Sequence, residues 1–173
     1  MDIANLRKRF LPNHLSIIFI AEAIPDSDDR FFYNFNTTSH DWLFLGLIRA
    51  LYPDINKEVK YLREHKKEIL ERFMNDGYYL VDAVDKYLPK STSSLERIKM
   101  IANNSKNKID EVKILISERG DKTTKVILIK STVFKGLHEQ MINAGMPIVN
   151  NQMIPFPSNG QQKRFHKILL DTL

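Results

Sequence analysis

The 173-residue sequence contains no cysteine, and this absence excludes several classes of protein at once. Disulfide scaffolds, Cys-ligated zinc sites, iron–sulfur clusters and thiol-dependent enzymes all need that residue. Long apolar runs are also missing, since none reaches the roughly 18–20 residues that cross a bilayer. The basic N-terminal segment 1–14 lacks the apolar stretch of a secretory signal. We therefore expect a cytoplasmic protein with no membrane partner.

Glycine is scarce and histidine is scattered, which argues against several familiar sites. With only 6 glycines, the chain has no GxGxxG, GxxxxGK[ST] or GxSxG motif, so a glycine-rich phosphate loop is not expected. The 5 histidines form no HxxxH pair. We therefore predict neither a metal site nor a cofactor.

The charge balance is basic, with a formal net charge of +5. An excess of this size is compatible with a polyanionic partner such as nucleic acid, and it favours DNA only weakly, since many basic proteins bind none. The sequence contains no indication of an oligomeric state.

Apolar runs alternate with helical patterns along the chain, which is typical of a parallel sheet. Four buried strands are predicted, at 16–21, 78–84, 125–130 and 147–149. Helices are predicted at 2–12, 39–52, 56–74, 94–118 with a break near 103–105, 133–144 and 160–172. Ser39 is the expected cap of the second helix, and Arg7–Arg9 are expected on a solvated face. The pattern indicates a single domain over residues 1–173, of the α/β class, as a three-layer α/β/α sandwich with a central four-stranded parallel sheet.

Polar and aromatic residues follow the predicted strands. Glu22 and Asp82 stand near the ends of the first two strands, Ser131 and Thr132 follow the third, and residues 155–160 follow the fourth. The carboxyl ends of parallel strands share one edge, which is where ligands bind in open α/β sheets. Glu22 is the candidate general base or stabiliser of a cation. Each residue taken alone also fits a structural role, such as capping a turn or closing the edge of the core.

These residues resemble the motifs of the uracil-DNA glycosylase superfamily, over Leu15 to Leu169. The segment 21–25, AEAIP, is similar to the GEAPG form of the motif that follows the first strand, with Glu22 at its acidic position. The segment 79–84, YLVDAV, is similar to LLLNAV, with Asp82 in place of the asparagine. The segment 156–158, FPS, is similar to the start of HPSP, with Phe156 in place of the histidine.

The resemblance implies a uracil-DNA glycosylase-like fold and hydrolysis of the N-glycosidic bond of a damaged or deaminated base flipped from DNA. It implies that Glu22 is catalytic. The residues that would bind the base are Phe31, Phe32, Tyr33 and Asp82. The residues that would contact DNA phosphate or a groove are Phe156, Pro157, Ser158, Asn159, Lys163 and Arg164.

Three departures from the family pattern keep other functions open. Ile24 interrupts the first motif, an ionised Asp82 offers only acceptors, and Phe156 removes a histidine that could stabilise charge on the leaving base. The alternative is a catalytically altered nucleic-acid-binding or protein-interaction domain that keeps the glycosylase fold. A third hypothesis is an enzyme that acts on free nucleosides or nucleotides.

Overall fold

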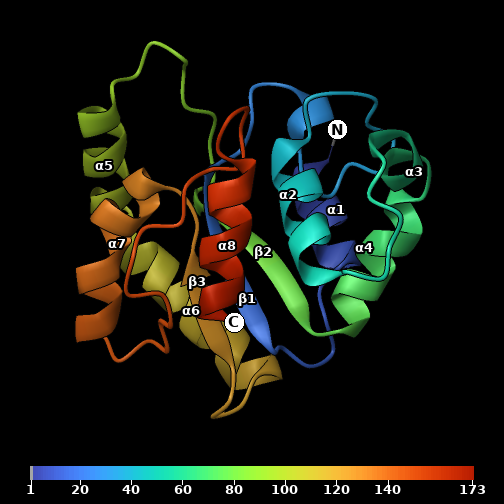
Figure 1. Cartoon of the computed structure of the whole chain (residues 1–173). Helices are drawn as coiled ribbons and strands as arrows, with labels where there is room; N and C mark the ends of the chain where they lie inside the picture. Colours follow the sequence, from blue (N-terminus) through green and yellow to red (C-terminus); the bar gives the residue numbers. More distant parts are fainter. Residues whose placement is uncertain (1) are drawn as a thin grey trace.

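The structure, a computed structural model, describes residues 2–173 and has a parallel sheet at its centre (Figure 1). Its strands are β1 (Ile17–Ala23), β2 (Tyr78–Val84) and β3 (Lys125–Leu128), in the order β2-β1-β3. The register pairs Ile17 of β1 with both Tyr78 and Lys125. Almost every strand residue is buried, because helices cover a parallel sheet on its two faces. The predicted α/β class with a parallel sheet is confirmed.

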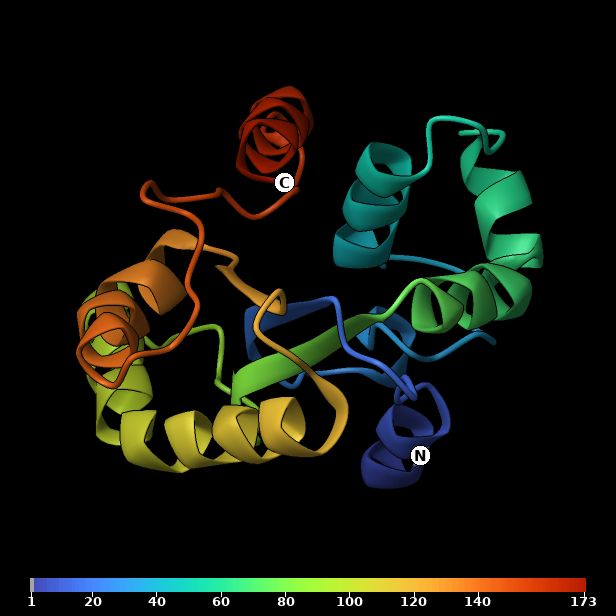
Figure 2. The same ribbon diagram turned by 90° about the horizontal axis from the view of Figure 1, so that it is seen from below.

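Helices lie on both sides of this sheet. Figure 2 shows α2 and α8 on one side and α1 and α6 on the other. The helices are α1 (Ile3–Arg9), α2 (Trp42–Leu51), α3 (Val59–Glu64), α4 (Lys66–Asn75), α5 (Ser94–Asn103), α6 (Ser105–Arg119), α7 (Ser131–Asn143) and α8 (Gln162–Thr172), with a 3-10 turn at Asp28–Arg30. Along residues 2–173, every helix is too short or too polar to cross a lipid bilayer.

The predicted fourth strand does not form, so the sheet of the described chain has three strands rather than four. Segment 147–154 lies beside β3 but makes only two isolated parallel bridges, Val126 with Ile148 and Ile129 with Ile154. Between them, the side chain of Asn150 takes over the pairing. Its Oδ1 accepts from the N–H of Leu128 at 2.9 Å, and its Nδ2 donates to the carbonyl of Leu128 at 3.2 Å.

The observed helix boundaries agree with the sequence-based prediction at some positions and differ at others. The break predicted near 103–105 is confirmed, since α5 ends at Asn103 and α6 begins at Ser105. The single helix predicted over 56–74 is wrong, because α3 and α4 meet at His65. Asp41, not Ser39, is the N-cap residue of α2.

The contact between α2 and the loop before α8 is close and fixes the loop at 155–160. A Cβ atom on Gly46 of α2 would lie 2.6 Å from Cβ of Pro157, a distance that no packed pair adopts. Pro157 is buried there, and Phe165 of α8 packs against the same glycine. The absence of a side chain at Gly46 therefore places Phe156 at the edge of the sheet.

Candidate functional site

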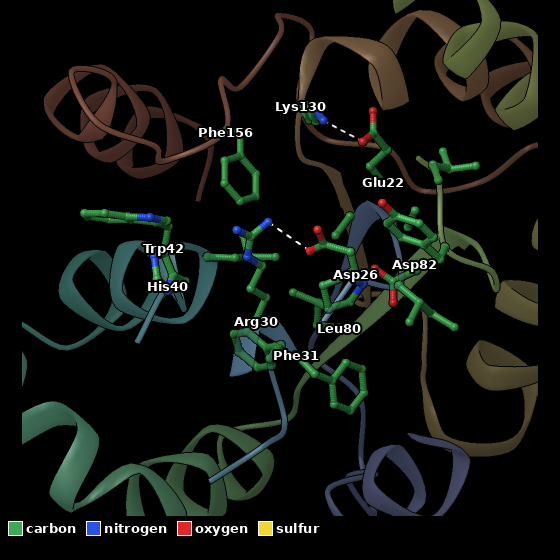
Figure 3. Close-up of a pocket in the computed structure, with 18 of the residues that line it drawn as sticks. Glu22, Asp26, Arg30, Phe31, His40, Trp42, Leu80, Asp82, Lys130 and Phe156 are labelled. Carbon is green, nitrogen blue, oxygen red and sulfur yellow. Dashed lines mark hydrogen bonds and ion pairs between the residues drawn. The ribbon is translucent and has the colours of Figure 1, made fainter. Parts of the chain in front are cut away.

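A cavity of about 390 Å³ opens at the carboxyl ends of β1 and β2 (Figure 3). Five of the residues predicted for the site line it: Glu22, Phe31, Phe32, Asp82 and Phe156. They come from β1, the loop after it, β2 and the loop before α8. The expectation that these strand ends and loops share one edge is therefore confirmed for these residues.

Glu22 is held by three partners. Its Oε2 lies 2.5 Å from Nζ of Lys130 and 2.9 Å from Nη1 of Arg97, and Oγ1 of Thr132 donates to its Oε1 at 2.5 Å. Burial raises the pKa of this carboxyl, but the hydrogen bonds from Lys130 and Thr132 and the charges of Lys130 and Arg97 outweigh it, so the pKa lies below its ordinary value. Glu22 is therefore an ionised carboxylate within a cluster whose net charge is +1.

Asp82 is paired with a residue that the sequence analysis placed in solvent. Arg7 of α1 forms ion pairs with Asp82 and with Asp85, the latter at 2.8 Å, and only 13% of its side chain is exposed. The expectation of a solvated face is thus wrong for Arg7. Burial raises the pKa of Asp82, and Arg7 and Lys108 oppose this without cancelling it, so the pKa lies above its ordinary value.

The aromatic cluster at 31–33 belongs mainly to the core. Phe31 and Phe32 form part of the cavity wall but are almost fully buried. Tyr33 does not line the cavity, so its predicted role in binding a base is not supported. Its hydroxyl donates to the carbonyl of Leu80 at 3.1 Å and accepts from the N–H of Leu80 at 2.7 Å. Tyr33 thus satisfies a backbone pair that the sheet leaves free.

The residues predicted to contact DNA are divided among different surroundings. Phe156 lines the cavity, with Nζ of Lys130 5.9 Å from its ring centroid. Pro157 is buried against Gly46 of α2 and lies outside the cavity lining. Ser158 is half-buried and lies outside the cavity lining, as do the three exposed members of the set, Asn159, Lys163 and Arg164.

The cavity is also lined by charged residues that the sequence motifs do not include. Arg30 and Lys90 lie 2.9 and 3.3 Å from the carboxylate of Asp26, which also faces the cavity. With Arg97 and Lys130, the lining has four cations against three acids, and Asp82 is neutralised from behind by Arg7. The cavity is therefore electropositive.

Two exposed aromatic residues of the cavity were also not predicted from the sequence. Trp42, at the start of α2, and Tyr87, after β2, line the cavity with 37% and 46% of their surface exposed. Neither belongs to a predicted motif, and a single exposed aromatic residue carries no periodic signal in a sequence.

Two cavity residues adopt strained backbone conformations. His40 has φ of 60° and Lys130 has φ of 86°, and they are the non-glycine residues with positive φ in the described chain. Lys130 combines this φ with ψ of 140°, a region that glycine alone occupies without strain. Residues of this kind concentrate at ligand sites, because the surrounding structure must hold them there.

No protein-family model matches the sequence, and no curated protein or solved structure matches it either. Among residues 2–173, no group of three or more histidine, aspartate or glutamate side chains is arranged to hold a metal ion. A function must therefore be argued from the geometry of the cavity.

Proposed function

We propose that the protein is a DNA base glycosylase-like hydrolase whose cavity receives a base flipped out of DNA. The observation that carries this proposal is the meeting of Glu22, Phe31, Asp82 and Phe156 around one cavity of about 390 Å³. A volume of this size lies within the range of small-molecule sites and suits a base with its sugar. The electropositive lining is complementary to the flanking phosphates.

The fold that we propose is the uracil-DNA glycosylase-like α/β/α sandwich. Helices on both sides of a parallel sheet support it, as does the position of segment 147–154 beside β3, where the fourth strand of the predicted sheet would lie. The two bridges of that segment make it a distorted edge rather than a regular strand.

In the proposed reaction the bond between C1′ of the sugar and the base nitrogen breaks, and the electron pair leaves with the base. The sugar then carries positive charge, which the Glu22 carboxylate stabilises, and water adds to C1′ and gives up a proton that the departing base takes up. Lys130 and Arg97 exceed the charge of Glu22 by one and stabilise the negative charge on the departing base. Lys130 supplies a cation near Phe156, the position at which the family that the sequence resembles has a histidine.

Asp82 is the proposed reader of the base edge. Arg7 donates to Oδ2 of its carboxylate, and Asp82 lines the cavity together with Leu80 (Figure 3). An ionised carboxylate accepts hydrogen bonds only, so a base with an exocyclic amine is preferred over uracil, whose O4 is an acceptor.

One observation favours the alternative of a nucleic-acid-binding domain without turnover. The oxygens of Glu22 already accept from Lys130, Arg97 and Thr132, so a water that reaches the sugar must compete with these partners. A pocket that binds a base without cleaving its bond would have this arrangement.

Base release tests the two functions. Purified full-length protein is incubated with oligonucleotides that carry uracil, hypoxanthine, xanthine or a mismatched normal base, and the abasic sites are cleaved with alkali. We expect release from at least one substrate, and loss of release in Glu22→Gln with the fold retained by circular dichroism. Salt-dependent DNA binding without base release would contradict the glycosylase and favour the nucleic-acid-binding domain. If the protein neither binds DNA nor releases a base, both functions are refuted.

A further inference from the structure

A second hollow lies outside the cavity, between α2 and α8, with a volume of about 230 Å³. We call it the α2–α8 groove. Leu45, Gly46 and Pro157 give it an apolar lining, and Arg49, Lys57 and Lys163 add positive charge. Among residues 2–173, no aspartate or glutamate lines it, so the groove is complementary to an anionic ligand with an apolar face.

Trp42 lines both the cavity and the groove, which makes the two hollows neighbours on one surface. Figure 3 shows its indole near Phe156, on the side of the cavity away from Asp82. It is the single tryptophan of the sequence, and 37% of its surface is exposed. A ligand that extends from the cavity past Trp42 enters the groove.

The backbone next to Trp42 is anchored from within the protein. Asp41, the N-cap residue of α2, is fully buried, with Oδ1 accepting from Nη2 of Arg63 at 2.8 Å and Oδ2 lying 3.5 Å from Nζ of Lys66. The indole is thus presented from a fixed point on α2, which reduces the ordering required when a ring stacks on it.

We propose that the α2–α8 groove is a second nucleotide subsite, in which single-stranded DNA continues from the nucleotide held in the cavity. A neighbouring base stacks on Trp42, and Lys57 and Lys163 contact phosphates. Unpaired strands expose the base faces that such stacking requires, whereas a duplex stacks its bases on one another. The inference rests on the proposed function in taking DNA as the ligand, but it needs no base release.

Tryptophan fluorescence reports this contact directly, because Trp42 is the only such residue. The full chain is titrated with an eight-nucleotide single strand and with the same sequence as a duplex. We expect quenching by the single strand and tighter binding of it than of the duplex. Trp42→Ala should weaken binding of a labelled single strand about tenfold, and Trp42→Phe should weaken it less, since a base–aromatic stack contributes on that scale.

The electrostatic half of the subsite is tested by Lys57→Ala/Lys163→Ala against Lys106→Ala/Lys113→Ala. Lys106 and Lys113 are exposed on α6, on the other side of the sheet, so the control removes the same charge from a surface outside both hollows. We expect the first pair to reduce the slope of log K against log salt by about 1.4, the value for two phosphate contacts to a single strand, and the second pair to leave it unchanged.

Four results would overturn the inference: no quenching, a duplex bound as tightly as the single strand, equal effects of the two lysine pairs, or an RNA strand bound more tightly than DNA. Its failure is distinguishable from that of the glycosylase. Base release from a substrate without quenching of Trp42 by the single strand would refute the groove alone. Stacking on Trp42 without release from any substrate would refute the enzyme alone.

Discussion

A variant with alanine is usually more stable than the corresponding variant with glycine, but at position 130 we expect the reverse. Lys130 lines the cavity, pairs with Glu22 at 2.5 Å and has φ of 86°. Both substitutions remove the same ion pair and the same contact with Phe156, so the difference between them isolates the backbone. We expect Lys130→Gly to be the more stable variant.

The magnitude follows from two opposing contributions. Alanine at this φ and ψ keeps the strain, which costs about 1–3 kcal/mol, and glycine relieves it. Glycine also gives the unfolded chain more freedom, which costs about 0.4–1 kcal/mol. The net preference for glycine is then about 1.3 kcal/mol at the middle of the two ranges, or about 3–5 °C in melting temperature for a chain of this size.

Thermal denaturation followed by circular dichroism measures this difference, and Lys135 provides the control. Lys135 is an exposed residue within α7, the helix that begins directly after Lys130. There alanine should be more stable than glycine by about 0.5–1 kcal/mol, the ordinary preference of a helix interior. If Lys130→Ala is as stable as Lys130→Gly, the strained conformation is wrong, and strain at Lys130 no longer supports a ligand site at the cavity.

Three further results are expected. Glu22 has a pKa below its unfolded value of 4.5, so its ionised form stabilises the fold above that pH. The advantage of wild type over Glu22→Gln in urea denaturation should shrink as the pH falls below about 4.5, and an advantage that grows in acid would contradict it. Gly46→Ala should lower stability by about 1–3 kcal/mol in thermal melts, because its Cβ would lie 2.6 Å from Pro157. Tyr33→Phe leaves the buried N–H and carbonyl of Leu80 without their partner and should cost about 1–3 kcal/mol in chemical denaturation, whereas an unchanged midpoint would argue against the bonds.

The strands could be predicted because a buried parallel strand is a short, continuous run of apolar residues, which is visible in the local sequence. The predicted bounds of β2, residues 78–84, agree with the structure, and β1 and β3 differ from prediction only at their ends. The fourth strand failed because Asn150 replaces backbone pairing with its side chain, a choice that depends on Leu128 lying opposite. The break at His65 is similarly tertiary, because Lys66 after it is buried beside Asp41 and Phe44.

The candidate site was predictable in its acids but not in their partners. Glu22 and Asp82 were placed on one edge by the parallel arrangement, which needs only strand direction. Arg97 and Lys130 lie 75 and 108 positions from Glu22, and no local pattern couples residues at such separations. The inward position of Tyr33 was not predictable for the same reason, because the packing of distant elements decides which side chain of an aromatic run points into the core.

Glu22 has more cationic partners than its low pKa requires. A carboxylate that is ionised only to stabilise the fold needs one well-placed partner, and Thr132 with Arg97 already provides a donor to each oxygen. Lys130 adds a third contact from a backbone that only glycine tolerates without strain. A glycine there would leave Glu22 paired and the start of α7 relaxed. The lysine is therefore best explained by the positive charge that it brings to the cavity, next to Phe156, rather than by the stability of the sheet.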